Sequence, residues 1–169
     1  MIRNIEENEL EKLREWRNST KINRYLFNRR EISSSEHEAW FREVEKNPLR
    51  DILVYEENDK LVGFMQLKKT DEKTDVFEWG FYIDPEQLGE GLGSRFAVDA
   101  LNYIFAKFKA EKIFGQVVSS NIPSIKLHEY LGFKLEGTLR KHCYLNETYQ
   151  DVFLFGLLKQ EWLLKRENI

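Results

Sequence analysis

Apolar residues recur along the chain with two periods, which predicts that helices alternate with strands. Apolar positions three or four residues apart indicate helices with one buried face, and alternating or continuous apolar runs indicate strands. The predicted helices cover residues 6–18, 34–46, 94–108 and 122–133, and the predicted strands cover 2–5, 51–57, 60–70, 76–84, 112–119, 134–145 and 148–158. The order β-α-α-β-β-β-α-β-α-β-β contains no linker. It predicts a single α/β domain over residues 1–169, with a mixed central sheet and flanking helices.

The pattern also indicates the faces and ends of these helices. Serines at 33–35, with Glu36 or Glu38, predict a capping box at the start of the second helix. Gly132 predicts a left-handed cap at the end of the fourth helix, and a charged tail is expected after the last strand. The residues predicted to face inward are Leu10, Leu13 and Trp16 in the first helix, Ala39, Trp40 and Val44 in the second, and Ala97, Leu101, Ile104, Phe105 and Phe108 in the third.

Composition and charge narrow the class of protein. Of the 169 residues, 41% are hydrophobic and 33% charged, as in a globular protein rather than a disordered one. The net charge of −3 gives no positive field for nucleic acid. A single cysteine, Cys143, excludes an internal disulfide and a cysteine-based zinc cluster. With no apolar leader or membrane-length run, we expect a cytoplasmic protein that binds neither membrane nor nucleic acid, and a homodimer is left open.

One short stretch, QLGEGLGS at residues 87–94, places three glycines between a predicted strand and a predicted helix. It lacks the spacing and the lysine of a phosphate-binding P-loop. It also lacks the third glycine and the parallel strand context of a dinucleotide-binding turn. Backbone amides at a helix start could still hold a pyrophosphate, helped by the helix dipole. The alternative, a flexible turn without a ligand, is favoured if the glycines are considered alone.

The sequence around this turn resembles the two core motifs of the GCN5-related N-acetyltransferase superfamily. The resemblance rests on YIDPEQLGEGLGSRFAVDAL and on VVSSNIPSIKLHEYLGFKLEG, and it extends to the order of elements along nearly the whole chain. It implies acetyl-CoA as the co-substrate and no metal. The glutamine or arginine that usually opens the family's turn falls on Leu88 here, with Gln87 one residue early. This departure leaves the side-chain assignments at the turn open.

The resemblance implies cofactor-binding roles for residues in the glycine turn, in the predicted strand before it and at Asn121. Gly91 and Gly93 fill the glycine positions of the turn, and Phe81 and Ile83 would offer strand backbone to the pantetheine arm. Asn121 matches an asparagine near that arm. The residues implied to bind the cofactor are Phe81, Ile83, Leu88, Gly89, Gly91, Leu92, Gly93, Ser94 and Asn121.

Two side chains are candidates for proton transfer during acetylation. His128 aligns with the position where the superfamily often carries a tyrosine acid, and its usual pKa near 6.5 suits that role. Its alternative role is packing among aromatic residues or facing solvent. Glu78 is the candidate base, and an ordinary strand carboxylate in solvent is the alternative. His37 is expected to be solvated, and His142 and Cys143 are expected to be structural.

Arginines and aromatic residues concentrate between residues 17 and 30, which suggests an acceptor carrying phosphates and a base. A solvated loop with packed aromatic residues is the alternative. The residues predicted to bind the acceptor are Arg17, Asn18, Tyr25, Phe27, Arg29 and Arg30.

The first two helices and the final strands further resemble a nucleotide-sugar N-acetyltransferase family of pseudaminic acid biosynthesis. The segments WRN, EHEAWF and FKLEGTLRKHCY carry this likeness. It implies the 4-amino group of a UDP-linked aminodideoxy sugar as the acceptor. Ribosomal-protein N-terminal and polyamine acetyltransferases share similar motifs and remain alternatives. A non-catalytic acetyl-CoA-binding domain is a second alternative, because a cofactor turn does not prove turnover.

Overall fold

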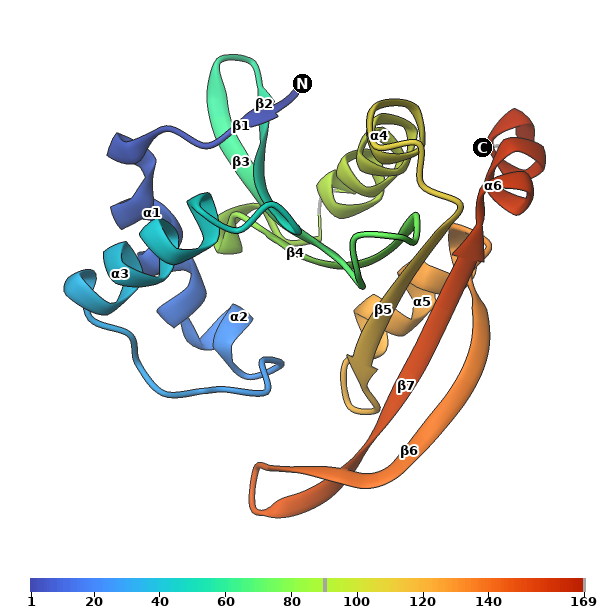
Figure 1. The fold of residues 1–169 in the computed structure, drawn as a ribbon. Coiled ribbons are helices and arrows are strands. Elements are labelled where there is room, and N and C mark those ends of the chain that lie inside the picture. Colours follow the sequence, from blue (N-terminus) through green and yellow to red (C-terminus); the bar gives the residue numbers. More distant parts are fainter. Residues whose placement is uncertain (90, 169) are drawn as a thin grey trace.

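The computed structural model describes residues 1–89 and 91–168, which form one seven-stranded sheet in the order β1-β2-β3-β4-β5-β7-β6 (Figure 1). Neighbouring strands are antiparallel except for the parallel pair β4 and β5, so the sheet is mixed as predicted. The strands are β1 Ile2–Asn4, β2 Arg50–Glu57, β3 Lys60–Lys69, β4 Val76–Ile83, β5 Lys112–Val118, β6 Lys134–Leu145 and β7 Thr148–Leu158. The helices are α1 Leu10–Asn18, α2 Thr20–Asn23, α3 Ser34–Glu45, α4 Leu92–Lys107, α5 Ile122–Tyr130 and α6 Lys159–Lys165, with short 3-10 turns at Glu7–Glu9, Pro85–Gln87 and Arg166–Asn168.

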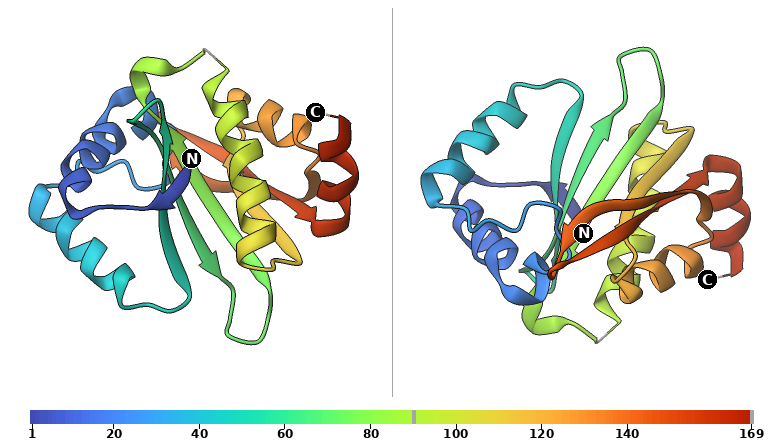
Figure 2. Two further views of the ribbon diagram at one scale, coloured as in Figure 1. Left: turned by 90° about the horizontal axis from the view of Figure 1, so that it is seen from above. Right: turned by 90° about the horizontal axis from the view of Figure 1, so that it is seen from below.

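Helices cover both faces of the sheet (Figure 2). The alternation of side chains along β4 assigns Trp79 and Ile83 to the core shared with α4, whereas Tyr82 packs against the core shared with α1 and α3. This is the parity expected for a strand buried on both sides. In the part of the chain that the structure describes, no helix has the length and apolar character needed to span a membrane.

Two predicted helix caps are confirmed. Ser33 begins α3 by accepting a hydrogen bond from the Glu36 amide, and the Glu36 side chain accepts one from the Ser33 amide, which completes the capping box. Gly132 follows α5 with φ +89°, a conformation that favours glycine. These local signals were readable because they involve residues close together in the sequence.

The inward face of α3 differs from the prediction. His37, Phe41 and Val44 are the buried residues, whereas Ala39 is exposed and Trp40 is half-buried. His37 stacks on Trp40 with ring centroids 5.1 Å apart, so the expectation of a solvated histidine was wrong. Burial and neighbouring arginines lower the pKa of His37, which keeps the ring neutral and suited to packing.

Two helices were missed by the sequence prediction. The four-residue α2 is too short to show a period, and α6 lies in the segment expected to be a charged tail. Trp162 in α6 is fully buried, and its Nε1 donates to Asn102 Oδ1 of α4 at 3.1 Å. This single aromatic residue attaches the last helix to the core.

The parallel pair β4 and β5 opens after three pairs of residues. Pairing runs from Val76 opposite Lys112 to Glu78 opposite Phe114 and then stops, although β4 continues to Ile83 and β5 to Val118. The C-terminal part of β4, beyond Glu78, is therefore paired only with β3. Its other edge presents backbone groups that a strand-like ligand could pair with.

Candidate active site

The opening between β4 and β5 positions Phe81 and Ile83 on an unpaired strand edge. Phe81 lies opposite Met65 of β3, and Ile83 lies opposite Gly63. This part of β4 is therefore paired with β3 on one side and unpaired on the other. An extended, amide-containing chain can add to such an edge as a further strand. The backbone of Phe81 and Ile83 is thus available for the role predicted for it.

The glycine turn leads directly from this edge into α4. Gly89 has φ +94° and Gly91 has φ +74°, a left-handed conformation in which Gly91 serves as the N-cap of the helix. Amides in the first turn of a helix lack the usual partner four residues earlier, although the Ser94 amide here donates to the Gly91 carbonyl oxygen at 3.1 Å. The amides around Leu92 can therefore bind an anion, which the helix dipole also favours.

Gly93 adds evidence that this turn receives a ligand. A Cβ atom at Gly93 would lie 3.9 Å from Ile83 Cδ1, an ordinary contact, and its φ is not positive. Neither the packing nor the backbone conformation therefore requires glycine at this position. A glycine at a helix start leaves room for a ligand to approach the backbone closely, which is the role predicted for it. Ser94 follows within the first turn, and Leu88 precedes the turn with 44% of its surface exposed.

Asn121 occupies the start of α5. Its Oδ1 accepts a hydrogen bond from the Ser124 amide at 3.2 Å, which makes it the N-cap of that helix. The asparagine that the resemblance assigned to the cofactor arm thus has a structural task that explains its residue type.

We expect Asn121→Ala to lower the free energy of unfolding by about 1 kcal/mol, because a capping acceptor is lost. Chemical denaturation measures the change. Asn121→Asp preserves the acceptor and serves as the matched control. Equal losses in both variants would contradict a capping role.

His128 is buried among aromatic rings at the base of the opening, with 3% of its surface exposed. Its Nδ1 lies 2.8 Å from the Ser124 carbonyl oxygen, and its Nε2 accepts from Trp79 Nε1 at 3.3 Å. This pattern fits one neutral tautomer, with the proton on Nδ1. Burial lowers the pKa of His128 to about 4, so this environment favours packing over proton donation.

Stability should depend on pH through His128. The pKa of His128 is about 4 in the folded protein and about 6.5 in an unfolded chain, so only the unfolded chain binds the proton in between. The free energy of unfolding should therefore fall as the pH decreases from 6.5 towards 4, by at most about 1.4 kcal/mol per unit.

Replacement of His128 by Gln should reduce this pH dependence, because the titrating group is removed. Denaturation curves of both proteins across this pH window measure the difference, and the contribution of His37 cancels. Parallel curves for the two proteins would show that His128 has the same pKa in both states.

Glu78, the candidate base, lies at the last paired position of β4. Its Oε1 accepts a hydrogen bond from Gln116 Nε2 of β5 at 3.0 Å, so the two side chains bridge the opening. By strand parity they lie on the face opposite Trp79. A half-buried carboxylate here can accept a proton from an amine, and the role stays a prediction.

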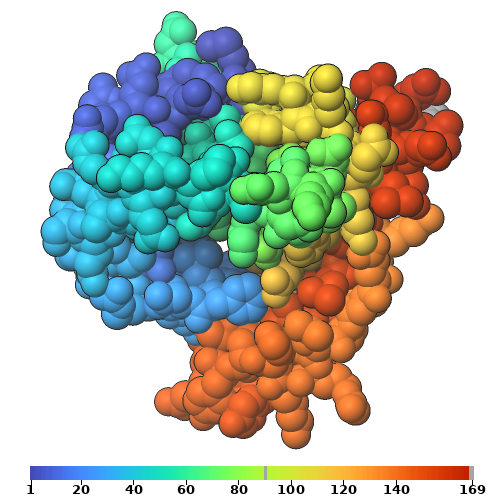
Figure 3. Space-filling model, in the orientation of Figure 1, coloured from blue at the N-terminus to red at the C-terminus, as the bar shows by residue number. Residues whose placement is uncertain are grey.

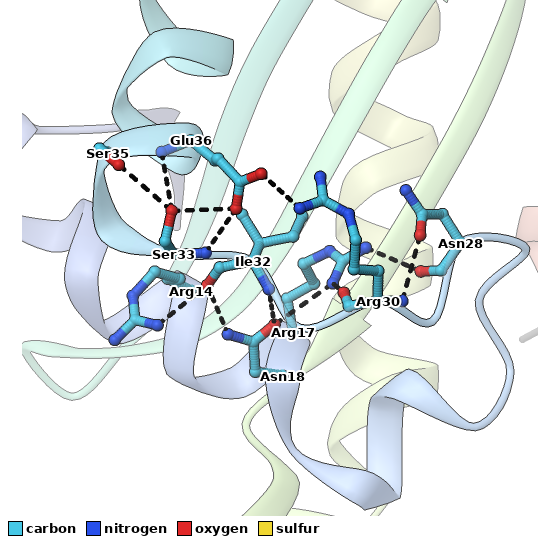
Figure 4. A network of polar contacts seen from close by, with 9 residues as sticks. All are labelled: Arg14, Arg17, Asn18, Asn28, Arg30, Ile32, Ser33, Ser35 and Glu36. Carbon is cyan, nitrogen blue, oxygen red and sulfur yellow. Dashed lines mark hydrogen bonds and ion pairs between the residues drawn. The ribbon is translucent and has the colours of Figure 1, made fainter.

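The segment 17–32 is held by its own polar side chains (Figure 4). Arg17 donates to the carbonyl oxygens of Asn28 at 2.7 Å and Arg30 at 2.9 Å. Asn18 exchanges two hydrogen bonds with the backbone of Ile32. Arg17 and Asn18, predicted to bind the acceptor, therefore shape the loop, and the Arg30 side chain pairs with Glu36.

A cavity of about 340 Å³ lies beside this loop and brings together three distant segments. Arg29 joins two of them, because its guanidinium donates to Asn146 Oδ1 at 2.7 Å and to the Arg24 carbonyl oxygen. Asn146 belongs to the turn of the β6–β7 hairpin, which projects from the molecule (Figure 3). The cavity is lined by Thr20, Lys21, Arg24, Tyr25, Ser120 and Asn146.

Of the residues predicted to bind the acceptor, Tyr25 lines this cavity and Arg29 stabilises it, whereas Phe27 is exposed on the loop. The sequence prediction missed Ser120 and Asn146, because only the fold brings them to residues 20–25. Among residues 1–89 and 91–168, no group of three or more His, Cys, Asp or Glu side chains is arranged to hold a metal.

Comparison with protein families identifies the chain. The acetyltransferase (GNAT) domain matches residues 2–154. The chain belongs to the GNAT family. GNAT relatives include a prophage-derived uncharacterised N-acetyltransferase of Bacillus subtilis, 32% identical over 133 residues, or 78% of this chain and 75% of the relative. Spermidine N(1)-acetyltransferase of Vibrio cholerae is 27% identical over 167 residues, or 98% of this chain and 96% of the relative.

The GNAT fold is also that of a solved structure, spermidine N-acetyltransferase from Vibrio cholerae in complex with CoA and spermine. The TM-score is 0.90 at 26% identity, covering 96% of this chain and 97% of the other. The GNAT protein described here is an acetyl-CoA-dependent N-acetyltransferase. The finer likeness to nucleotide-sugar enzymes finds no support among these relatives. They favour the polyamine alternative instead.

Proposed function

We propose that the unpaired edge of β4 and the start of α4 hold acetyl-CoA, and that an amine approaches from the α2 side. Gly93 carries this proposal, because neither packing nor backbone conformation requires glycine there, and a glycine at a helix start lets a ligand approach closely. The amides of Leu92 and Gly93 would hold the pyrophosphate, and the Ser94 amide already donates to the Gly91 carbonyl oxygen at 3.1 Å. The pantetheine arm pairs with the backbone at Phe81 and Ile83. When bound, acetyl-CoA supplies the thioester.

Transfer requires a neutral amine, and Glu78 is the proposed acceptor of its proton. The carboxylate lies at the base of the opening, within hydrogen-bond distance of Gln116. Both ring nitrogens of His128 are hydrogen-bonded, so the ring is not free to donate a proton to the leaving thiolate. In this proposal, positioning of the two substrates therefore supplies most of the rate increase. The thiolate of CoA can leave with a proton from solvent, since thiol pKa values lie near 8.5.

For the acceptor, we infer an amine that also carries a negative group, as a nucleotide-linked aminosugar does. The cavity beside α2 supports this inference through its charges. Lys21 and Arg24 are cationic, and none of the six lining residues that the structure describes is acidic. Glu86 forms an ion pair with Lys21 at 3.1 Å and offsets one charge at the rim. The positive charge that Glu86 does not offset would repel a polycation.

A polyamine is the second candidate acceptor, and the relatives support it. Enzymes 23–27% identical to this chain over nearly its full length are spermidine N(1)-acetyltransferases. The charge of the cavity and the identity of the relatives therefore favour opposite acceptors. A direct competition separates them.

The experiment offers acetyl-CoA with equal concentrations of a UDP-linked 4-amino sugar, spermidine and an amine-terminated peptide, and identifies the acetylated product by mass spectrometry. We expect the nucleotide sugar to have the highest kcat/KM. Preference for spermidine would overturn the inferred acceptor but would leave the acetyltransferase activity supported. Acetyl-CoA binding without transfer to any amine would instead favour a binding domain.

A further inference from the structure

Trp79 and Gly115 are the first residues of β4 and β5 that do not pair with each other, and they directly follow the last pair, Glu78 and Phe114. In a parallel ladder, residues in register point to the same face of the sheet. The positions of Trp79 and Gly115 are therefore neighbours on the face that α5 covers. His128 of α5 reaches the same place through its hydrogen bond to Trp79.

Gly115 leaves room for this hydrogen bond. A Cβ atom at Gly115 would lie 2.9 Å from Trp79 Nε1 and 3.1 Å from His128 Nε2. These are the two atoms that the hydrogen bond joins. A side chain on β5 would thus occupy the space that the indole and imidazole fill. Three residues from three elements depend on one another at the point where the sheet opens.

The contacts continue from this point to the edge of β4. The Trp79 ring lies 4.8 Å from the Phe81 ring, and the His128 ring lies 6.4 Å from it. Phe133 also stacks on the Trp79 ring, with ring centroids 5.2 Å apart, and Phe155 stacks on His128. Packing of this kind fixes ring orientations, because dense cores transmit small displacements. The position of Phe81 therefore depends on the Trp79–His128 pair.

We propose that Trp79, Gly115 and His128 form a wedge that sets the separation of β4 from β5 and positions the β4 edge at Phe81 for acetyl-CoA. His128 acts in the wedge as a hydrogen-bond acceptor and as a positioning residue. The inference rests on the proposed binding of acetyl-CoA at this edge. It assigns a task to a histidine, a tryptophan and a glycine that the transfer chemistry does not use.

Two replacements of His128 separate a hydrogen-bond acceptor from an acid. His128→Gln retains an acceptor oxygen near the Nε2 position, whereas His128→Phe retains an aromatic ring without an acceptor. We expect His128→Gln to keep kcat and the Kd for acetyl-CoA within about threefold of wild type. We expect His128→Phe to raise that Kd at least about tenfold. A loss of kcat of about 10²-fold or more in His128→Gln would assign the acid role instead.

Substitutions of the other two wedge residues test the same claim independently of His128. Gly115→Ala should raise the Kd for acetyl-CoA about tenfold, and Trp79→Phe should do the same by removing the donor. Gly137→Ala on β6 is the matched control, since its Cβ would lie an ordinary 3.6 Å from Leu154 Cδ1. Calorimetry measures the binding, and thermal unfolding identifies variants that do not fold.

The outcomes also separate the wedge from the proposed function. Wild-type protein that does not bind acetyl-CoA would overturn the proposed site itself. Wild-type binding that Gly115→Ala and Trp79→Phe both leave unchanged would overturn the wedge alone. In the folded Trp79→Phe variant, nuclear magnetic resonance of labelled histidine should show the His128 pKa raised, because the donor that favours the neutral ring is gone.

Discussion

Gly91→Val is expected to weaken acetyl-CoA binding about a hundredfold, or about 2.8 kcal/mol at 1.4 kcal/mol per factor of ten. Gly91 caps α4 with φ +74°, a conformation that a β-branched residue rarely adopts. The substitution therefore misdirects the amides at the start of the helix. Calorimetry with acetyl-CoA gives the change in affinity. Gly137→Val provides the matched control, because this strand residue lacks a positive φ.

Gly93→Ala distinguishes loss of the turn from exclusion of the ligand. Alanine favours the helix by up to about 1 kcal/mol over glycine, and the structure has space for its methyl group, so thermal stability should rise or stay level. The methyl group would nevertheless stand where the ligand approaches, so acetyl-CoA affinity should fall. Undiminished affinity in a folded Gly93→Ala protein would contradict the assignment of the pyrophosphate to this turn.

Reversing the charge of the α2 cavity should exchange the acceptor preference. In the double variant Lys21→Glu and Arg24→Glu, we expect kcat/KM for the UDP-aminosugar to fall about tenfold or more and that for spermidine to rise. Two charge reversals next to a charged ligand alter its binding by several kcal/mol at most, and solvent screens part of this. Lys21 also donates to the Pro85 carbonyl oxygen just before the glycine turn, but no residue of that turn that the structure describes lines the cavity, so the KM for acetyl-CoA should change less than the KM for the acceptor.

A matched control for the charge reversal uses Lys46→Glu and Lys73→Glu, two exposed residues that do not line the cavity. This control changes the net charge by the same amount. An equal effect in both double variants would show that overall charge, and not the cavity, determines the preference. An unchanged kcat/KM for the UDP-aminosugar in the cavity variant would contradict the inferred acceptor.

The elements that sequence analysis predicted correctly have local signals. The capping box at Ser33, the cap at Gly132 and the glycine turn each depend on residues within a few positions of one another. The turn was informative because its glycines follow a strand and precede a helix. The fold class followed from the order of such elements and was confirmed.

The features that were missed depend on contacts between distant segments. Nothing within β4 indicates that pairing with β5 ends at Glu78, and nothing near Lys21 indicates that Ser120 and Asn146 lie beside it. Arg17 has the residue type of a phosphate ligand, but the loop folds back so that its carbonyl groups bind the guanidinium.

His128 illustrates how the environment decides a role. The resemblance placed it at the position of a family acid, and an exposed histidine could serve in that way. In the folded protein, aromatic rings exclude water and Trp79 donates to the nitrogen that would need to carry the proton. The sequence contains all of these residues but does not show that they meet.

The most direct measurement is a nuclear magnetic resonance titration of the labelled protein with acetyl-CoA, followed amide by amide. We predict the largest shifts at Phe81 and Ile83 on β4 and at Leu92, Gly93 and Ser94 at the start of α4. The amides of the α2 cavity should respond only when an acceptor amine is added. Shifts concentrated in that cavity with acetyl-CoA alone, and none along β4, would contradict the proposed site.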